Sequence, residues 1–401
     1  MSLFPYQETG ARWLAARRFA YLADEMGLGK TPQAICAADL AGARAVSVVC
    51  PASVKANWER EIERWSLGFW DYDVRSYDNA VRHGLPKADT YIIDEAHYLK
   101  TPGAARTKTL LGAGSRLRDG QRIWALSGTP APNHLGEMWT WLRLFGATEL
   151  AHRKFLEAHV NFRDTPYGPK VFGNKRGAAE KLAADLAPWF LRRRKAEVLS
   201  DLPPIRWGDI SLAPSVSDRL PEVDISLTMG DDLPAEDEHI ARLRNQTGEL
   251  KAAPLAAFLA EELQATGEKI VVFAWHRSVM DALEQGLAKF GVARIDGSTP
   301  SAQRQGVVDR FQAENGCRVF LGQITAAGAG ITLTAASNLI FAEMSWTPGD
   351  NAQAAMRVHR IGQDRPVLIR TATLRGSIDE AVNAVLARKT RALNELYGAT
   401  T

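Results

Sequence analysis

The chain has 401 residues, of which 46% are hydrophobic and 24% are charged. This composition is typical of a folded soluble protein and excludes disorder, collagen and coiled coil, while the length suits two domains of roughly 150–200 residues each. Three cysteines without a C-x-x-C pair argue against a disulfide framework or a zinc ribbon. No apolar run reaches the length of about 18 residues that a membrane span needs. We therefore expect a cytoplasmic protein that does not bind a membrane.

The net charge of +3 conceals a local asymmetry. Residues 151–200 hold eleven Lys/Arg against five Asp/Glu, whereas residues 201–240 hold two against ten. A basic block of this kind can meet a polyanion, but two solvated surfaces of opposite sign explain the pattern equally well. Charge alone leaves both interpretations open.

Short β-branched and aromatic runs alternate with longer helical stretches along the chain. They predict strands at 19–23, 45–50, 90–94 and 122–127, and again at 269–274, 318–322, 338–342 and 367–372. Strands separated by helices indicate parallel sheets built from βαβ units. The expected fold class is therefore α/β, with two parallel-sheet domains in tandem.

Two stretches of biased charge separate the two groups of strands: a basic stretch that ends in FLRRRKAEVLSDLPP, and an acidic one around GDDLPAEDEH. They predict a first domain at 1–187, with a helical insertion at about 135–187, and a linker at 188–250. The second domain then spans 251–401. Apolar residues at helical spacing predict that it ends in a docked helix at 377–396.

A glycine-rich segment, DEMGLGKT, follows the first predicted strand and precedes a predicted helix. Backbone N–H groups of such a loop, here around Gly27 and Gly29, bind phosphates together with the helix N-terminus. Lys30 is then placed for the β- and γ-phosphates and Thr31 for Mg²⁺. The match is to GxGK[ST], because Asp24 stands where the general pattern has its first glycine.

An acidic pair ends the apolar run of TYIIDEAHYLK. Such pairs often only cap a following helix. Behind a phosphate loop, however, Asp94 is placed to hold Mg²⁺ and Glu95 to orient and deprotonate the water that attacks the γ-phosphate. Since no second His or Cys lies close to His97 in the sequence, we expect it to link the nucleotide to neighbouring motifs rather than to bind a metal.

Seven motifs occur in a characteristic order: DEMGLGKT, VVCPASVKANWEREIERW, DEAH, ALSGTP, FLRRRKAEVL, IDGST and RVHRIGQ. Over about residues 3–397 the chain thereby resembles the Swi/Snf-type ATPases, which are double-stranded-DNA translocases of helicase superfamily 2. The stretch 322–363 is most similar to the annealing-helicase branch, the HepA-related fork remodellers. The resemblance implies RecA-like domains, ATP and Mg²⁺ as cofactors, double-stranded or branched DNA as the partner, and a monomer.

By the same resemblance, Arg357 and Arg360 are arginine fingers from the second domain, and Gln363 belongs to their nucleotide-binding motif. Their spacing of three predicts that the two arginines share one face of a helix. Gln7 resembles the family's adenine-reading glutamine. With Lys30 and Glu95, the two arginines make up the expected catalytic set.

DNA contacts are also implied by the resemblance. In the first domain these are Ser53, Lys55, Asn57 and Thr129, together with Arg193 and Arg194 of the basic cluster, which face DNA or bridge the domains. In the second domain they are His276, Arg277, Ser298, Thr299 and Thr325. A motor that moves along DNA holds the sugar-phosphate backbone in this way because its movement cannot depend on base sequence.

The function expected is ATP-dependent translocation on double-stranded DNA, with ATP hydrolysed to ADP and phosphate when DNA is bound and with remodelling or annealing of branched DNA. Two alternatives remain open at this point. One is a strand-separating superfamily 2 DNA helicase, and the other is a nucleotide-gated DNA-binding scaffold that does not hydrolyse ATP.

Overall fold

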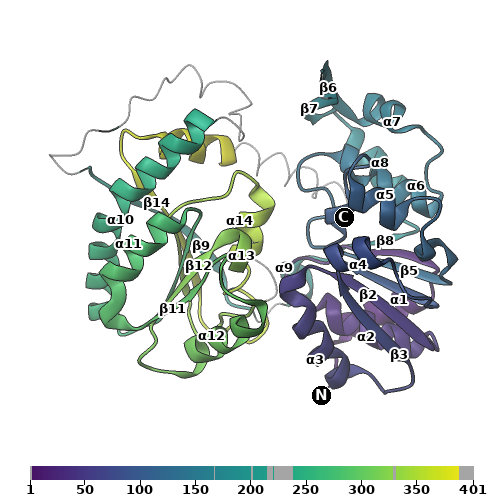
Figure 1. Ribbon diagram of the computed structural model, residues 1–401, viewed down its shortest axis with the longest axis horizontal. Coiled ribbons are helices and arrows are strands. Elements are labelled where there is room, and N and C mark those ends of the chain that lie inside the picture. The colour runs from purple at the N-terminus through teal and green to yellow at the C-terminus, as the bar shows by residue number, and fades with distance from the viewer. Residues whose placement is uncertain are drawn as a thin grey trace. The chain divides into compact units, whose positions relative to one another are not determined.

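The computed structural model describes residues 2–166, 168–199, 202–214, 220, 238–327 and 331–387 (Figure 1). The chain divides into two compact units near residue 200. Each unit is built on a six-stranded sheet in which every paired strand runs parallel to its neighbour. The predicted α/β class with two parallel sheets is therefore confirmed.

The sheet of the first unit has the strand order β3-β2-β4-β5-β1-β8. Its strands are β1 (Phe19–Leu22), β2 (Ala45–Cys50), β3 (Asp71–Ser76), β4 (Thr90–Asp94), β5 (Arg122–Leu126) and β8 (Phe190–Leu191). The helices between them are α1 (Pro5–Ala15), α2 (Lys30–Leu40), α3 (Lys55–Trp65), α4 (Tyr77–His83) and α5 (Ala105–Leu111). Short 3₁₀ turns are η1 (Ala52–Val54), η2 (Ala96–Leu99), η3 (Arg116–Asp119) and η4 (Leu135–Met138).

Both faces of this sheet are buried, as is usual for parallel sheets flanked by helices. Tyr21, Ile93 and Ala125 face one apolar cluster, while their neighbours in the strands, such as Leu22 and Ile92, are buried on the other face. Successive side chains of a strand point to opposite faces, so the strands read as continuous apolar runs. This explains why the sequence pattern located them.

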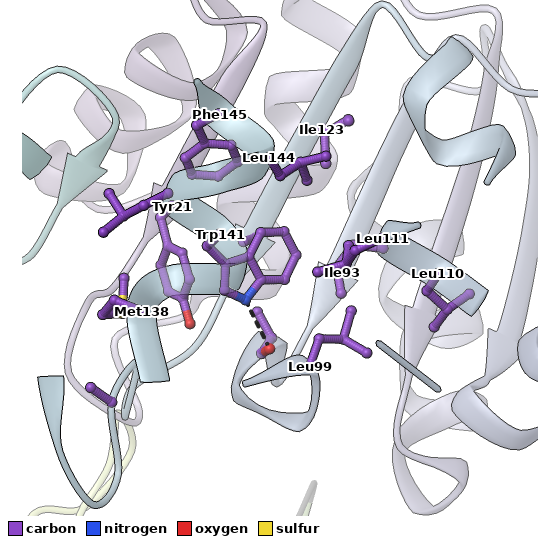
Figure 2. Close-up of a cluster of buried hydrophobic side chains, with 14 of the residues drawn as sticks. Tyr21, Ile93, Leu99, Leu110, Leu111, Ile123, Met138, Trp141, Leu144 and Phe145 are labelled. Carbon is purple, nitrogen blue, oxygen red and sulfur yellow. Dashed lines mark hydrogen bonds between the residues drawn. The ribbon is translucent and has the colours of Figure 1, made fainter. Parts of the chain in front are cut away.

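The predicted insertion lies between β5 and β8. It contains α6 (Trp139–Phe145), α7 (His152–His159), β6 (Val160–Thr165), β7 (Gly168–Asn174) and α8 (Ala178–Leu186), and α9 (Lys195–Val198) follows β8. It is not wholly helical, because β6 and β7 pair as an antiparallel hairpin. Figure 2 shows how α6 joins the core: Trp141 is buried against Tyr21, and its indole nitrogen donates to the carbonyl oxygen of Ala96 at 3.1 Å.

The sheet of the second unit has the order β11-β12-β10-β13-β14-β9. Its strands are β9 (Ile205–Leu212), β10 (Ile270–Ala274), β11 (Val292–Ile295), β12 (Val319–Gln323), β13 (Asn338–Phe341) and β14 (Val367–Leu374). Its helices are α10 (Glu238–Thr266), α11 (Arg277–Leu287), α12 (Ser301–Ala313), α13 (Ile324–Ala327) and α14 (Pro348–Ala355), with the short turn η6 (Ala288–Phe290). Val272 and Phe273 of β10 face different apolar clusters, so this sheet too is buried on both faces.

Two of the predicted boundaries differ from the structure. Residues 188–250 were expected to be a linker, yet they include β8, which pairs with β1, and β9, which pairs with β14 along its whole length. They also include the first part of α10. The basic and acidic stretches were wrongly interpreted as a linker, because edge strands such as β9 are half-exposed and carry polar residues.

Residues 378–387 of the predicted C-terminal helix are helical, and Ile378, Val382 and Val385 pack against Ile240 and Leu243 of α10. Residues 388–396 lie outside the described part of the chain. Among the helices that the structure describes, none combines the length and the apolar character that a membrane crossing requires.

Candidate nucleotide site and nucleic-acid surface

Three predicted motifs follow strands whose carboxyl ends are level with one another. Leu22 of β1 and Asp94 of β4 both pair with Leu126 of β5, which lies between them in the sheet. The glycine-rich loop, the acidic pair and the SGTP segment therefore all leave the sheet at one edge, the one formed by the carboxyl ends of its strands. Ligands of parallel α/β sheets bind at this edge, because only loops lie beyond it.

The glycine-rich loop has the backbone that phosphate binding needs. Gly27 and Gly29 adopt φ values of 88° and 70°, in the left-handed region that favours glycine. Gly29 is the residue before α2, so the first N–H groups of the helix open onto the loop. Lys30 donates its ammonium to the carbonyl oxygen of Asp24 at 2.8 Å, and burial lowers the pKa of this lysine.

The SGTP segment is packed closely against this loop. A Cβ at Gly128 would lie 3.4 Å from the Lys30 ammonium nitrogen and would collide with the side chain of Met26. Only glycine allows the two loops to approach this closely. The placement of Lys30 thus depends on a loop almost a hundred residues further along the chain.

Gln7 lies directly beneath the glycine-rich loop. Its amide donates to the carbonyl oxygen of Leu28 at 3.1 Å and accepts from the backbone N–H of Phe4 at 3.0 Å. The Tyr6 hydroxyl also donates to Leu28, at 3.1 Å. This position beside the loop is compatible with the predicted reading of adenine, which stays a prediction.

The acidic pair is partly buried and held by neighbouring groups. Asp94 accepts from the Trp58 indole at 2.8 Å and from the Glu95 backbone N–H at 2.9 Å. Burial, and then the charge of Glu95, raises the pKa of Asp94 to about 6. Among the described non-glycine residues, Glu95 alone has a positive φ, 50°, and such strain is typical of functional sites.

A polar path connects the acidic pair to the SGTP segment. Glu95 lies 3.3 Å from Nδ1 of His97, and the same nitrogen lies 2.9 Å from the Ser127 hydroxyl. Ser127 in turn accepts from the backbone N–H of Thr129 at 3.1 Å. His97 therefore joins the acidic pair to the SGTP segment, and its predicted link to the nucleotide stays a prediction.

The residues at this edge fit a magnesium-bound nucleotide. Asp94 is a buried carboxylate whose raised pKa reflects a charge that lacks full compensation, and a divalent cation would supply it. Thr31 stands in the first turn of α2, beside the loop glycines. Hydroxyl and carboxylate oxygens are the ligands that Mg²⁺ prefers.

Arg193 is not placed as a DNA contact. Its guanidinium binds the carboxylate of Asp24, with an Nε–Oδ1 distance of 2.9 Å, and also donates to Gln33 and to the carbonyl oxygen of Tyr6. Asp24 is fully buried and the Arg193 side chain is 13% exposed. A fully buried carboxylate needs such a partner, so this arginine anchors the glycine-rich loop.

Arg193→Ala is expected to destabilise the first unit by about 3–5 kcal/mol, because it leaves the Asp24 carboxylate buried and unpaired. Urea unfolding followed by tryptophan fluorescence measures the change. The control is Arg194→Ala, which removes a side chain that is 41% exposed and should change little. In a double-mutant cycle with Asp24→Asn, additive losses would show that the two side chains do not interact.

The other predicted DNA contacts of the first unit lie at two places. Ser53 and Asn57 are partly buried and Lys55 is exposed, all around the start of α3. Lys55 pairs with Glu59 one turn later, at 3.5 Å. Thr129 is buried beside the nucleotide loop instead.

The predicted DNA contacts of the second unit gather where β10, β11 and β12 end. Arg277 begins α11 and reaches the Ser298 hydroxyl at 3.5 Å, while Thr299 accepts from the backbone N–H of Asp296 at 3.0 Å. Thr325 is exposed in α13, directly after β12. The carboxyl ends of parallel strands meet at one edge, and this brings these residues together.

His276 is held by a residue that the sequence analysis did not single out. Glu343, which follows β13, accepts from the backbone N–H groups of Trp275 and His276 at 2.9 Å each, and lies 2.7 Å from Nδ1 of His276. These contacts hold the pKa of Glu343 below its usual value although it is buried. A lone glutamate after an apolar run carries no local signal of such a role.

The RVHRIGQ segment differs from its predicted helix. Helix α14 ends at Ala355, and Arg357 and Arg360 lie in turns after it. Arg360 donates to the carbonyl oxygen of Ile331 at 2.9 Å, and the Arg357 carbonyl accepts from the Leu333 N–H. The spacing of three therefore does not place the arginines on one helical face.

Gln363 is held by backbone groups of its own unit. Its side chain is buried and donates to the carbonyl oxygens of Ala336 and Val358, at 2.8 and 3.2 Å, and accepts from the backbone N–H of Arg365. It thus fastens the RVHRIGQ turns to the second unit. Both ends of its amide have backbone partners, and the predicted role in nucleotide binding stays a prediction.

Comparison with known proteins adds to this picture. An SNF2-related domain matches residues 6–84 and 72–215, and a helicase conserved C-terminal domain matches residues 251–362. One relative is the SWI/SNF-related matrix-associated actin-dependent regulator of chromatin subfamily A-like protein 1 homolog of Caenorhabditis elegans, 32% identical over 98% of this chain and 62% of the relative. Another is the DNA annealing helicase and endonuclease ZRANB3 of Mus musculus, 32% identical over 96% of this chain and 40% of the relative.

Among solved structures, the SWI2/SNF2 ATPase core of Sulfolobus solfataricus in complex with double-stranded DNA covers 100% of this chain and 94% of that one, with 21% identity and a TM-score of 0.44. The chain spans less than two thirds of the length of the two curated relatives.

The two parallel sheets and the phosphate loop define a tandem α/β protein of the P-loop class. The match of the first half identifies it further: the chain belongs to the SNF2-related family.

Proposed function

We propose that the chain is an ATP-dependent double-stranded-DNA translocase of Swi/Snf type, which hydrolyses ATP to ADP and phosphate when DNA is bound and acts on branched DNA. The observation that carries the proposal is the single sheet edge where Lys30, Asp94 and Glu95 lie, with His97 linking Glu95 to Ser127. The names of the relatives, which include a DNA annealing helicase, support the same reading.

In this proposal the glycine-rich loop and Lys30 bind the phosphates of ATP. Thr31 and Asp94 would hold Mg²⁺, which neutralises phosphate charge when bound. Glu95 orients the attacking water and takes its proton. The left-handed backbone at Glu95 supports this role, because such strained conformations cluster at functional sites.

His97 would report the state of this site to the SGTP segment. The contact of His97 with Glu95 and its contact with Ser127 involve the same ring nitrogen, Nδ1. A change in the hydrogen bonds of Glu95 would therefore change the hydrogen bond between His97 and Ser127. Ser127 also orders the backbone at Thr129. Hydrolysis and the conformation of this loop would thereby be coupled.

In this proposal each unit contributes DNA-binding groups of its own: Ser53, Lys55 and Asn57 in the first unit, and the strand-end cluster in the second. That cluster contains His276, Arg277, Ser298, Thr299 and Thr325. Exposed or half-exposed hydroxyl, amide and basic groups suit contacts to phosphates, which carry no sequence information. In the first unit, Arg194 of the basic cluster is exposed enough to contact DNA together with these residues.

DNA binding is expected to fall steeply with salt and to be indifferent to base sequence. Release of counterions gives a log–log slope of about −0.9 for each phosphate neutralised on duplex DNA. Fluorescence anisotropy of labelled duplexes between low and moderate salt measures this slope. In a second experiment, phosphate release measures the ATPase rate without nucleic acid and with single-stranded DNA, duplex, fork and RNA.

Duplex or forked DNA should stimulate ATP turnover far more than RNA. A stronger response to RNA would contradict the proposed substrate, and turnover that no nucleic acid stimulates would contradict the motor function. Unwinding of a tailed duplex would instead favour a strand-separating helicase. Binding of ATP without phosphate release would favour a scaffold.

A further inference from the structure

The insertion of the first unit carries a feature that the proposed function does not use. Strands β6 and β7 form an antiparallel hairpin that is separate from the six-stranded sheet. Figure 1 shows the hairpin at one end of the first unit, with α7 beside it. Such a hairpin needs packing on one face only, so its other face is available to solvent.

The two faces of the hairpin differ in character. Phe162 pairs with Val171, and both pack against the core of the unit. The next pair, Arg163 with Lys170, lies on the opposite face because successive residues of a strand alternate. Both residues are exposed. The hairpin therefore places two positively charged residues opposite each other on its exposed face.

An exposed aromatic residue, Phe172, follows Lys170 by two positions in β7. The register shifts after Asn161, which leaves Phe172 as the extra residue of a β-bulge. Phe172 is 54% exposed, although it follows a residue that packs against the core. Bulges reorient side chains at functional edges, and an exposed ring costs free energy in water unless a partner covers it.

Further charge surrounds the hairpin. Residues 150–181 hold seven Lys/Arg against three Asp/Glu, and Arg176 is exposed just after β7. Two of the three acidic residues are already engaged, since Asp164 pairs with Arg153 at 2.8 Å and Glu157 pairs with Lys154 at 3.0 Å. The exposed surface that the structure describes is therefore positive and includes the ring of Phe172.

We propose that this hairpin surface, defined by Arg163, Lys170, Phe172 and Arg176, binds an unpaired strand of branched DNA. Phe172 stacks on a base, and the three cations contact the flanking phosphates. Cations combined with an exposed aromatic ring are the means by which proteins hold single strands, whereas a base inside a duplex has no free face for stacking. The surface thus distinguishes a fork from continuous duplex. This inference rests on the proposed function, in which DNA is the substrate.

The test compares the affinity of the full chain for a fluorescein-labelled fork with two unpaired arms and for a blunt duplex of the same length. For Phe172→Ala we expect the Kd for the fork to rise about tenfold and the Kd for the duplex to stay within about twofold, since stacking is lost only on the fork. Phe172→Trp should bind the fork like the wild type. For Arg163→Gln/Lys170→Gln we expect weaker fork binding and a salt slope reduced by about 1.4, from two single-strand phosphates.

Matched controls lie in the same unit. Phe69→Ala removes a ring outside the hairpin that is even more exposed, at 75%, and Arg82→Gln/Lys87→Gln removes two exposed charges elsewhere. Both should bind the fork like the wild type. The inference is overturned if the hairpin variants bind the fork normally, or if they lose the fork and the duplex to the same extent. Stimulation of the wild-type ATPase by duplex is measured separately, so a failure of the motor function remains distinguishable from a failure of the hairpin.

Discussion

Replacing Glu95 by glutamine is expected to lower DNA-stimulated ATP turnover by about 10²–10⁴-fold, the usual contribution of a general base. Glutamine keeps the size of the side chain and can still accept from His97, but it cannot take a proton from water. Because Lys30, Thr31 and Asp94 are unchanged, ATP binding should stay near the wild-type level. Phosphate release and the equilibrium binding of a fluorescent ATP analogue measure the two effects.

The control for this change is Glu63→Gln, which makes the same substitution at an exposed position of α3 and should leave turnover unaffected. The comparison with Lys30→Ala separates binding from chemistry, since losing the ammonium should weaken ATP binding itself. Equal turnover in the wild type and Glu95→Gln would show that the base is another residue.

Arg360→Ala is expected to lower the DNA-stimulated turnover by about 10³–10⁵-fold, the range that an arginine finger contributes in other phosphoryl-transfer enzymes. In our proposal the guanidinium of Arg360 reaches the γ-phosphate only when the two units close on ATP and DNA. ATP binding should survive, because the first unit alone holds the nucleotide. DNA binding should survive as well, since many groups share it.

The structure requires a control for local damage, because Arg360 also donates to the carbonyl oxygen of Ile331. Arg360→Lys keeps a charge that can reach this carbonyl but loses the planar fork, so it should fold normally and remain strongly impaired. Arg375→Ala removes an exposed arginine of the same unit and should behave like the wild type. Unchanged stimulation in Arg360→Ala, or loss of turnover through lost ATP binding alone, would contradict the finger assignment.

Arg193 is anchored inside the first unit, and Gln363 is held by backbone groups of the second unit. Both come from motifs that the resemblance assigned to ligands, and both are occupied by buried partners in their own unit. Arg193 supports the glycine-rich loop through Asp24, and Gln363 supports the turns that carry Arg357 and Arg360. Substitutions at these positions should therefore act first on stability and only through it on activity.

The sequence by itself determined the parts of this protein that depend on local patterns. Continuous apolar runs located the central strands because both faces of a parallel sheet are buried. The glycines around Lys30 indicated a phosphate loop, since few residues tolerate its backbone. The acidic pair at Asp94 followed from its place at the end of such a run.

Only the tertiary structure decided the features that depend on distant residues. Arg193 finds Asp24 across 169 positions, and β9 joins a sheet whose neighbouring strand, β14, lies more than 150 residues later. The hairpin β6–β7 was not predicted because its strands are largely exposed and polar, and because β7 contains glycine and proline. Pairing of this kind is set by which surfaces the whole fold brings together, and spacing along the chain does not contain that information.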